Sequence, residues 1–408
     1  MNTDYDITQD SNRVKKVEPS LIRTVLNRVD ELRKSGFDVI ALSAGEPDFN
    51  TPADIKEAAV NAINQNYTHY SSNRGYEKLR KKIAEKTLEE TGIEYDYQSE
   101  ILVTSSGAEA INNTILSIID EGDEAIIFSP AFVNYENMIK ISGGIPVIIN
   151  LERENQFEID IREVEKHITK KTKMLVINNP NNPTGAVYGS SVLKQLCELS
   201  VKHNFIIVSD EMYSRLVYDD VSFKSVAAFP GMKERSVIIN GFSKTYAMTG
   251  WRLGYITANE KRINGILKIH QYSTTCSPTF IQIGVAKGMD TELTKKEVSA
   301  MVHEFADRRI LLMKGLDKID GLSYVIPKGA FYIMVDVSKT GLSGMAFAGR
   351  LLEEKHVAVI PGIGLGKKCS DFIRISFAAS AENIHAALEK MNDFIKELGK
   401  LNETNFTG

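Results

Sequence analysis

The sequence contains little cysteine and lacks any long apolar run. Its three cysteines, Cys197, Cys276 and Cys369, lie far apart in 408 residues. This spacing excludes a disulfide framework and a zinc-ligand pattern, and it is typical of proteins in a reducing compartment. No apolar run approaches the roughly 20 residues that a membrane helix needs. We therefore expect a cytoplasmic protein with no metal site and no membrane segment.

An excess of positive charge is also missing. The chain has 49 Lys and Arg against 53 Asp and Glu, a net charge of −4. This balance does not favour binding to nucleic acid or to an anionic membrane surface. The first ten residues, MNTDYDITQD, are polar and acidic, and they do not resemble a signal peptide.

The central part of the chain alternates between short apolar runs and helix-like segments. The runs are rich in Ile and Val and read ILVTSS, AIIFSP, IPVIIN, KMLVINN, FIIVSD, SVIINGF and LGYITA. Runs of this kind, separated by helices, are typical of parallel strands that are buried on both faces. We predict an α/β fold with a mostly parallel seven-stranded sheet flanked by helices.

The two ends of the chain have a different pattern. Amphipathic stripes predict helices over 20–36, 294–318 and 381–398, and the short strands AFYIMVDV and FIRISF lie between the last two. We predict three parts. An N-terminal arm and part of a small domain span 1–49, a large ligand-binding domain spans 50–290, and the C-terminal α+β portion of the small domain spans 291–408.

Polar residues follow the predicted strands, and ligands of open parallel sheets bind beyond the carboxyl ends of the strands. The first run leads into Ser106, Gly107 and Ala108, which open a helix. Free N–H groups at a helix start suit an anion such as a phosphate. The polar residues that follow the later strands are each a weak signal alone. Together they fall at one predicted edge of the sheet: Asn179, Asn182, Asp210, Glu211, Tyr213, Ser243 and Lys244.

One ligand accounts for this combination. Pyridoxal 5′-phosphate has a phosphate, an aldehyde that forms a Schiff base with lysine, and a ring nitrogen that needs a carboxylate partner to stay protonated. The helix start, Lys244 and Asp210 would serve these three groups. We therefore expect Lys244, which follows a buried strand, to be the covalent anchor of this cofactor.

The segment SKTYAMTGWRLGY resembles the lysine signature of the class-I/II pyridoxal-phosphate aminotransferases of fold type I, the aspartate aminotransferase-like family. The segments AGEPDF, YSSNRGYEKLR, NNPNNPTG, DEMY and FIRISF resemble other landmarks of this family, in the same order. The resemblance implies an enzyme of amino acid metabolism. It would exchange an α-amino group between an amino acid and a 2-oxo acid through an internal aldimine on Lys244.

The resemblance also implies roles at the cofactor. Lys244 corresponds to the Schiff-base lysine, which then moves a proton between the substrate Cα and the cofactor. Asp210 corresponds to the partner of the ring nitrogen, and Tyr213 with Asn182 to the hydrogen-bonding partners of the phenolate oxygen. Further cofactor contacts are implied for Ser106, Gly107, Ala108, Phe132, Ser243 and Arg252.

Substrate and subunit contacts follow from the same resemblance. Arg374 corresponds to the arginine that binds the substrate α-carboxylate, for which a forked guanidinium is well suited. Gly45, Phe132 and Asn182 would line the substrate site. Tyr70 resembles the tyrosine that reaches the phosphate in the neighbouring subunit, which implies a homodimer.

Two positions depart from the family pattern. Gly241 stands where many relatives have a serine that binds the phosphate, so Ser243 or backbone groups would have to compensate. Ala108 stands where relatives that favour aspartate often carry a lysine for the distal carboxylate. This second departure argues against a dedicated aspartate enzyme and leaves the amino donor open.

Two alternative functions remain at this point. A carbon–sulfur lyase on the same fold would use the same anchor residues, so the sequence separates it poorly from an aminotransferase. A cofactor-sensing regulatory protein would need an appended DNA-binding domain of about 60 residues. Only some 20 residues precede the first family-like helix, and they are acidic, which is unsuited to phosphate contacts.

Overall fold

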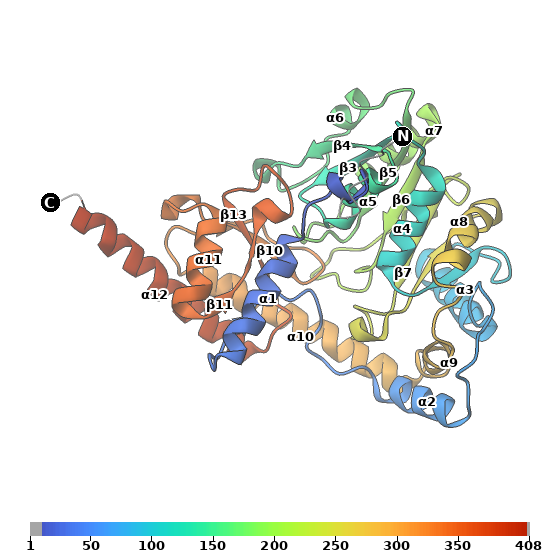
Figure 1. The fold of residues 1–408 in the computed structure, drawn as a ribbon, viewed down its shortest axis with the longest axis horizontal. Helices are drawn as coiled ribbons and strands as arrows, with labels where there is room; N and C mark the ends of the chain where they lie inside the picture. Colours follow the sequence, from blue (N-terminus) through green and yellow to red (C-terminus); the bar gives the residue numbers. More distant parts are fainter. Residues whose placement is uncertain (1–9, 406–408) are drawn as a thin grey trace, which may run out of the picture.

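A seven-stranded sheet forms the centre of the computed structural model, which describes residues 10–405 and the side chains of residues 10–399 (Figure 1). Only β8 runs antiparallel to its neighbours. Each predicted run forms one strand, so the mostly parallel seven-stranded sheet is confirmed. In spatial order the strands are β2 (Ile101–Thr104), β8 (Gly254–Thr257), β7 (Ser236–Gly241), β6 (Ile206–Asp210), β5 (Thr172–Asn178), β3 (Glu124–Ser129) and β4 (Ile145–Asn150).

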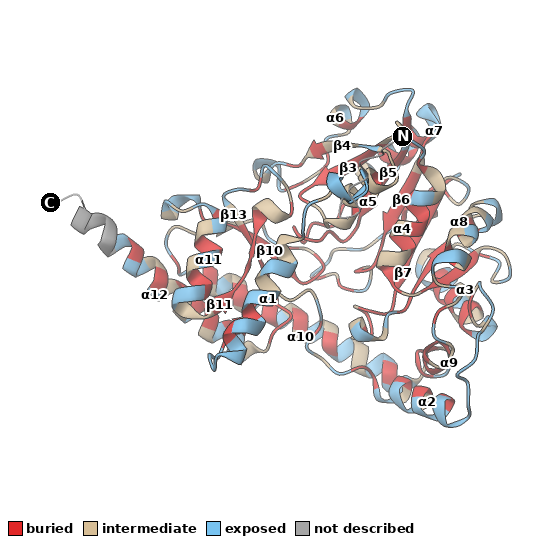
Figure 2. Cartoon of the chain, viewed as in Figure 1, coloured by how far each residue is buried: buried red, intermediate tan, exposed pale blue. Residues whose placement is uncertain are grey.

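Helices cover both faces of this sheet. Apolar side chains of α4 (Gly107–Ile118), α5 (Asn134–Ile141) and α8 (Glu260–Ser273) pack on one face. The opposite face is covered by α2 (Ala53–Asn64), α3 (Glu77–Thr91), α6 (Ile161–Lys166), α7 (Ser190–His203) and α9 (Thr279–Gly288). Figure 2 shows the strands between these layers as largely buried, except for the edge strand β4, whose residues are mostly of intermediate exposure. Burial on both faces explains why the other strands are apolar on both sides.

The N- and C-terminal segments form a second, smaller α+β unit beside the sheet (Figure 1). It contains a parallel pair, β1 (Ile40–Ala41) and β11 (Val357–Ala358), and an antiparallel sheet of β12 (Ile360–Pro361), β13 (Phe372–Ser376), β10 (Tyr332–Asp336) and β9 (Ser323–Tyr324). Its helices are α1 (Leu21–Lys34), α10 (Glu292–Leu316), α11 (Gly344–Lys355) and α12 (Ala381–Asn405).

Short 3-10 helices connect these elements at Val14–Lys16, Arg153–Asn155, Val226–Ala228, Thr249–Trp251, Ser338–Thr340 and Gly362–Gly364. We propose that the two units are separate domains with boundaries near residues 50 and 290. Residues 1–9 and 406–408 of these domains lie outside the described residues. No helix within 10–405 is long and apolar enough to cross a membrane.

Two glycines let α9 pack directly against the backbone of α2. A Cβ atom at Gly284 would lie 2.7 Å from the Cβ of Ala59, and one at Gly288 would lie 2.6 Å from the backbone nitrogen of Ile55. Real Cβ atoms do not approach this closely, and backbone atoms cannot rotate away. The close contact therefore depends on the absence of side chains.

We predict that Gly288→Ala lowers the melting temperature, because the new methyl group would push α9 away from α2 at a cost of about 1–3 kcal/mol. Gly265→Ala is the matched control, since Gly265 lies in α8 with open space around its Cβ position. That control should be neutral or stabilising by up to about 1 kcal/mol. Equal melting temperatures for the two variants would contradict the close packing.

Candidate active site

A cavity of about 570 Å³ lies where the carboxyl ends of the parallel strands face α1 and the smaller sheet. All of the predicted site residues except Tyr70 line it: Gly45, Ser106, Gly107, Ala108, Phe132, Asn182, Asp210, Tyr213, Ser243, Lys244, Arg252 and Arg374. Tyr70 lies outside the cavity and is 87% exposed. The single chain therefore brings together all the predicted residues that were expected to come from one subunit.

The start of α4 forms the anion-binding part of the cavity. Ser106 caps the helix, because its Oγ accepts a hydrogen bond from the N–H of Glu109 at 3.3 Å. The Glu109 carboxylate accepts in turn from the N–H of Ser105 at 2.5 Å. Ser106 has a φ of +121°, a strained conformation for a residue with a side chain. The reciprocal caps hold this turn in place and leave the N–H groups that follow it facing the cavity.

Gly241 and Gly254 explain one departure from the family pattern. They lie opposite each other where β7 pairs with β8. A Cβ atom at Gly241 would lie 3.1 Å from both the Cα of Gly254 and the carbonyl oxygen of Leu253. A Cβ at Gly254 would lie 2.7 Å from the backbone nitrogen of Gly107. A serine at position 241 would therefore be tight against β8, and a side chain at position 254 would collide with the turn that leads into α4.

Asp210 ends β6 and is buried beside the cavity. Its Oδ2 accepts a hydrogen bond from the hydroxyl of Tyr135 at 2.6 Å, and its Oδ1 accepts from the N–H of Met212 at 3.1 Å. Burial raises the pKa of this carboxyl, and the two hydrogen bonds oppose the rise. Among the described residues no cationic side chain forms an ion pair with it, so its charge is available to a ligand.

Lys244 follows β7 and reaches into the same cavity. Its Nζ donates a hydrogen bond to the carbonyl oxygen of Gly45 at 2.5 Å. Burial lowers the pKa of this amine to about 8. More of the amine is therefore neutral near pH 7 than for an ordinary lysine, and the neutral amine is the form that acts as a nucleophile or a base.

Two asparagines connect the strand ends. Asn178 donates through Nδ2 to the carbonyl oxygen of Asp210 at 3.0 Å and accepts through Oδ1 from the N–H of Asn182 at 2.7 Å. The hydroxyl of Tyr213 lies 3.0 Å from that of Tyr332, which belongs to β10 in the smaller unit. These bonds hold Asn182 beside the end of β6 and connect Tyr213 to the smaller unit.

Arg374 is a buried cation without an anionic partner. It is only 2% exposed, and it donates to Oδ1 of Asn182 at 3.1 Å and to the carbonyl oxygen of Ser43 at 3.0 Å. Its Nε has no hydrogen-bond partner, and no carboxylate of residues 10–399 pairs with it. Burial lowers the pKa of the guanidinium. An arginine held in this way is suited to an incoming carboxylate.

Comparison with known proteins identifies the family. The family profile described as aminotransferase class I and II matches residues 38–391. The chain belongs to this family. It is therefore an enzyme that transfers amino groups.

Several relatives of this aminotransferase are similar over almost their whole length. The aspartate aminotransferase of Pyrococcus abyssi is 40% identical over 387 residues, which cover 95% of this chain and 98% of that protein. Aromatic-amino-acid aminotransferase 2 of Thermococcus litoralis is 39% identical, with 95% and 98% covered. A solved structure of the Thermus thermophilus aspartate aminotransferase with maleate has a TM-score of 0.90 at 38% identity and covers 94% of this chain and 99% of that chain.

The aminotransferase cavity also contains residues that the sequence did not single out. Tyr135 lies three residues after Phe132, and Asn178 lies in the predicted strand KMLVINN next to Asn179, so both positions carried a weak signal. Tyr332 comes from the smaller sheet, and Ile22, Arg23 and Leu26 come from α1. No local pattern marks these four, because they reach the cavity only through the packing of the terminal segments.

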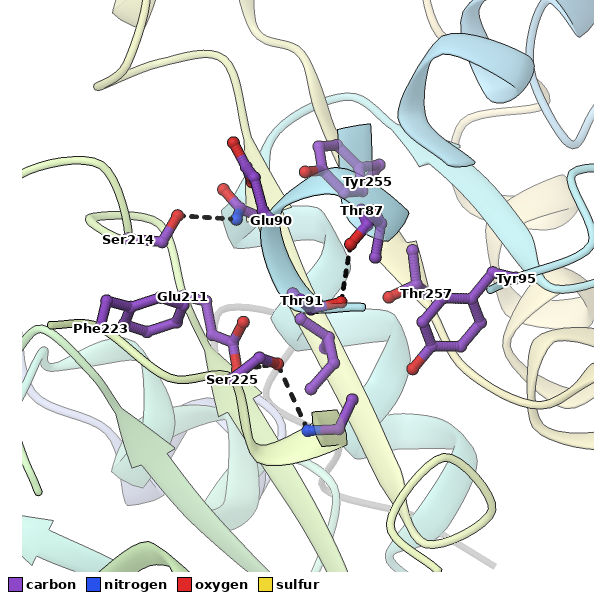
Figure 3. A pocket seen from close by; sticks show the side chains of 13 residues that line it. Thr87, Glu90, Thr91, Tyr95, Glu211, Ser214, Phe223, Ser225, Tyr255 and Thr257 are labelled. Atoms are coloured by element: carbon purple, nitrogen blue, oxygen red, sulfur yellow. Dashed lines mark hydrogen bonds between the residues drawn. The ribbon is translucent and has the colours of Figure 1, made fainter. Parts of the chain in front are cut away.

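A second, much smaller cavity of about 20 Å³ lies beside Glu211, the acidic residue that directly follows Asp210 (Figure 3). Glu211 Oε1 accepts hydrogen bonds from the hydroxyls of Ser209 and Ser225, both at 2.9 Å. The hydroxyls of Tyr95 and Thr257 line the same cavity and have no hydrogen-bond partner. The space suits one water molecule, and burial raises the pKa of Glu211 to about 7.

We predict that Glu211→Gln reduces the dependence of aminotransferase stability on pH. The folded protein holds the Glu211 proton more tightly than the unfolded chain, so the stabilisation is fully present below about pH 4.5 and is lost as the pH rises through 7. Between pH 5 and 8 the free energy of unfolding of the wild type should fall by about 2–3 kcal/mol more than that of the variant. Melting temperatures across this range, with the exposed Glu57→Gln as control, check this. Parallel curves for wild type and Glu211→Gln would contradict it.

Proposed function

We propose that this enzyme is a pyridoxal-phosphate-dependent aminotransferase that exchanges an α-amino group between an amino acid and a 2-oxo acid. The observation that carries the proposal is the grouping of Lys244, Asp210 and Arg374 around one cavity, none of them in an ion pair with another described side chain. A ligand must supply the missing charges. When bound, the cofactor supplies an aldehyde for the lysine and a ring that takes up the electrons of the substrate Cα–H bond.

The lining residues fit this cofactor. The N–H groups at the start of α4 and the Arg252 guanidinium would bind the phosphate. Asp210, buried at the end of β6, would pair with the ring nitrogen and keep a proton on it. Tyr213 and Asn182 would donate hydrogen bonds to the phenolate oxygen, and Phe132 would cover one face of the ring. Ser243, which also lines the cavity, would take the place of the serine that many relatives have at the position of Gly241.

Arg374 and Lys244 would position the substrate in the cavity. Arg374 would bind the α-carboxylate through two parallel hydrogen bonds, because Asn182 and Ser43 already fix the plane of its guanidinium. This would place the substrate Cα–H bond near the amine of Lys244. Lys244 would then remove the proton at Cα and deliver it to the cofactor carbon that carried the aldehyde. With the 2-oxo acid bound, it would carry out the reverse transfer and place a proton on the Cα of the new amino acid.

The preferred amino donor follows from the distal part of the cavity. Ala108 offers no charge to a second carboxylate, while Ile22, Leu26 and Phe132 supply apolar surface. We therefore propose that the enzyme accepts apolar or aromatic amino acids as well as aspartate. The relatives include both an aspartate and an aromatic-amino-acid aminotransferase, which supports this range.

We further propose a homodimer in which Tyr70 contributes to the neighbouring site. Tyr70 and Tyr272 are both 87% exposed. The segments that carry them are adjacent, because Asn73 donates to the carbonyl oxygen of Thr275 at 2.7 Å. Two exposed aromatic side chains on neighbouring segments are typical of a surface that another subunit covers.

We predict that Lys244→Ala abolishes the visible absorbance that the wild type gains with pyridoxal phosphate and lowers turnover by at least about 10⁴-fold. The measurement records the visible spectrum of each protein with pyridoxal phosphate. It then mixes each protein with an amino acid and a 2-oxo acid and quantifies the new amino acid that forms. Lys56→Ala, an exposed lysine in α2, is the control and should behave as wild type. Transamination at the wild-type rate by Lys244→Ala would end the assignment.

We predict that Tyr70→Phe weakens cofactor binding by about 10-fold, the loss of one hydrogen bond to a charged group. A mixed dimer of one Tyr70→Phe and one Lys244→Ala subunit should contain one intact site, with Lys244 from the first subunit and Tyr70 from the second. Cofactor affinity of co-expressed, differently tagged dimers checks this. If the mixed dimer binds no more tightly than the Tyr70→Phe homodimer, Tyr70 does not act across the interface.

A further inference from the structure

Tyr332 lies between the groups that are proposed to bind substrate and cofactor. It is 1% exposed, and its hydroxyl is 3.0 Å from that of Tyr213. The guanidinium of Arg374 lies over its ring, 4.5 Å from the centroid. A Cβ atom at Gly45 would be 3.1 Å from the same hydroxyl, so Gly45 leaves room for it. Tyr332 thus contacts one cofactor residue and one substrate residue.

The direction of the hydrogen bond between the two tyrosines follows from the charges around them. Burial raises the pKa of both phenols. At Tyr332 the guanidinium of Arg374 is the next influence on the pKa and opposes the rise. At Tyr213 the neighbouring Tyr332 adds to the rise, as does Asp210. Tyr332 is therefore the more acidic phenol and the better donor, which leaves the proton of Tyr213 free for a ligand.

Few other charges face this pair. Glu46 raises the pKa of Tyr332 and so opposes Arg374. At Tyr213, Asp210 raises the pKa and Arg374 itself lowers it, with a smaller effect than Tyr332 has. Arg374 forms no ion pair within residues 10–399, and its effect on Tyr332 is larger than that of Glu46. A carboxylate that binds to Arg374 changes this, because it neutralises the charge that makes Tyr332 a strong donor.

We propose that Tyr332 is a positioning residue that transmits the charge state of Arg374 to the hydroxyl of Tyr213. The inference rests on the proposed function, in which Tyr213 donates to the phenolate oxygen of the cofactor. When a substrate carboxylate binds, Tyr332 donates less strongly and Tyr213 becomes a weaker donor in turn. The phenolate oxygen then holds more negative charge, and the linkage between Lys244 and the cofactor keeps its proton to a higher pH.

The test is a pH titration of the visible absorbance of the cofactor-loaded dimer. The probes are maleate and 3-phenylpropionate, which carry a carboxylate but no amino group. Each is added at saturation. In the wild type a probe should raise the titration midpoint. In Tyr332→Phe this rise should be smaller by about 0.5 to 1 pH unit, the effect of one hydrogen bond.

Tyr218→Phe is the matched control. Tyr218 is equally buried, but its hydroxyl donates to the carbonyl oxygen of Ala330 at 2.5 Å, outside the cavity. This variant should keep the full rise. If Tyr332→Phe does not fold, Tyr213→Phe interrupts the same connection at its other end and should show the same reduction.

The outcomes separate the two proposals. A wild type that gains no visible absorbance with pyridoxal phosphate would overturn the proposed function itself. A wild type whose midpoint does not move with either probe, or a Tyr332→Phe variant with the full wild-type rise, would overturn only the role of Tyr332.

Discussion

The structure depends on charges that are withdrawn from water without a protein counter-charge. Asp210 and Arg374 are buried and Lys244 is shielded in the cavity, and none of them forms an ion pair with another described side chain. Withdrawing an unpaired ion from water costs several kcal/mol. The rest of the fold must hold these groups in place until ligands supply the opposite charges. A rigid, fully packed sheet meets this requirement better than mobile loops.

A small number of close contacts in the sheet help to hold these groups in place. Gly254 lets β8 approach the start of α4 at distances that no side chain would permit, and Gly241 sits tightly against β8. Ser106 caps α4 by accepting from the N–H of Glu109. Asn178 connects two of the turns that follow the strands, because it bonds to the carbonyl oxygen of Asp210 and to the N–H of Asn182. The backbone therefore fixes where Asn182 lies relative to Asp210.

Much of this arrangement could be predicted from the sequence, for a physical reason. Strands such as KMLVINN are apolar on both sides because both faces are covered, so they stand out without any knowledge of the fold. Asp210 and Lys244 follow such strands, and the topology of a parallel sheet brings strand ends together. Tyr332, Ile22 and Leu26 could not be found in this way, since they enter the cavity only when the terminal segments pack beside the sheet. The proposed role of Tyr70 depends on a contact with a second subunit.

The helix α10 gives the fold a mechanical property. It begins near α2 and α9, and it ends against α12 in the smaller unit (Figure 1). Its 25 residues make a rod about 37 Å long. A tilt of about 3° at one end of such a rod displaces the other end by about 2 Å, a sizeable fraction of the spacing between bonded groups in the cavity. A small tilt of α10 would therefore change the distance between Arg374 in the smaller unit and Lys244 beside the large sheet, and with it their ability to bind one small molecule together.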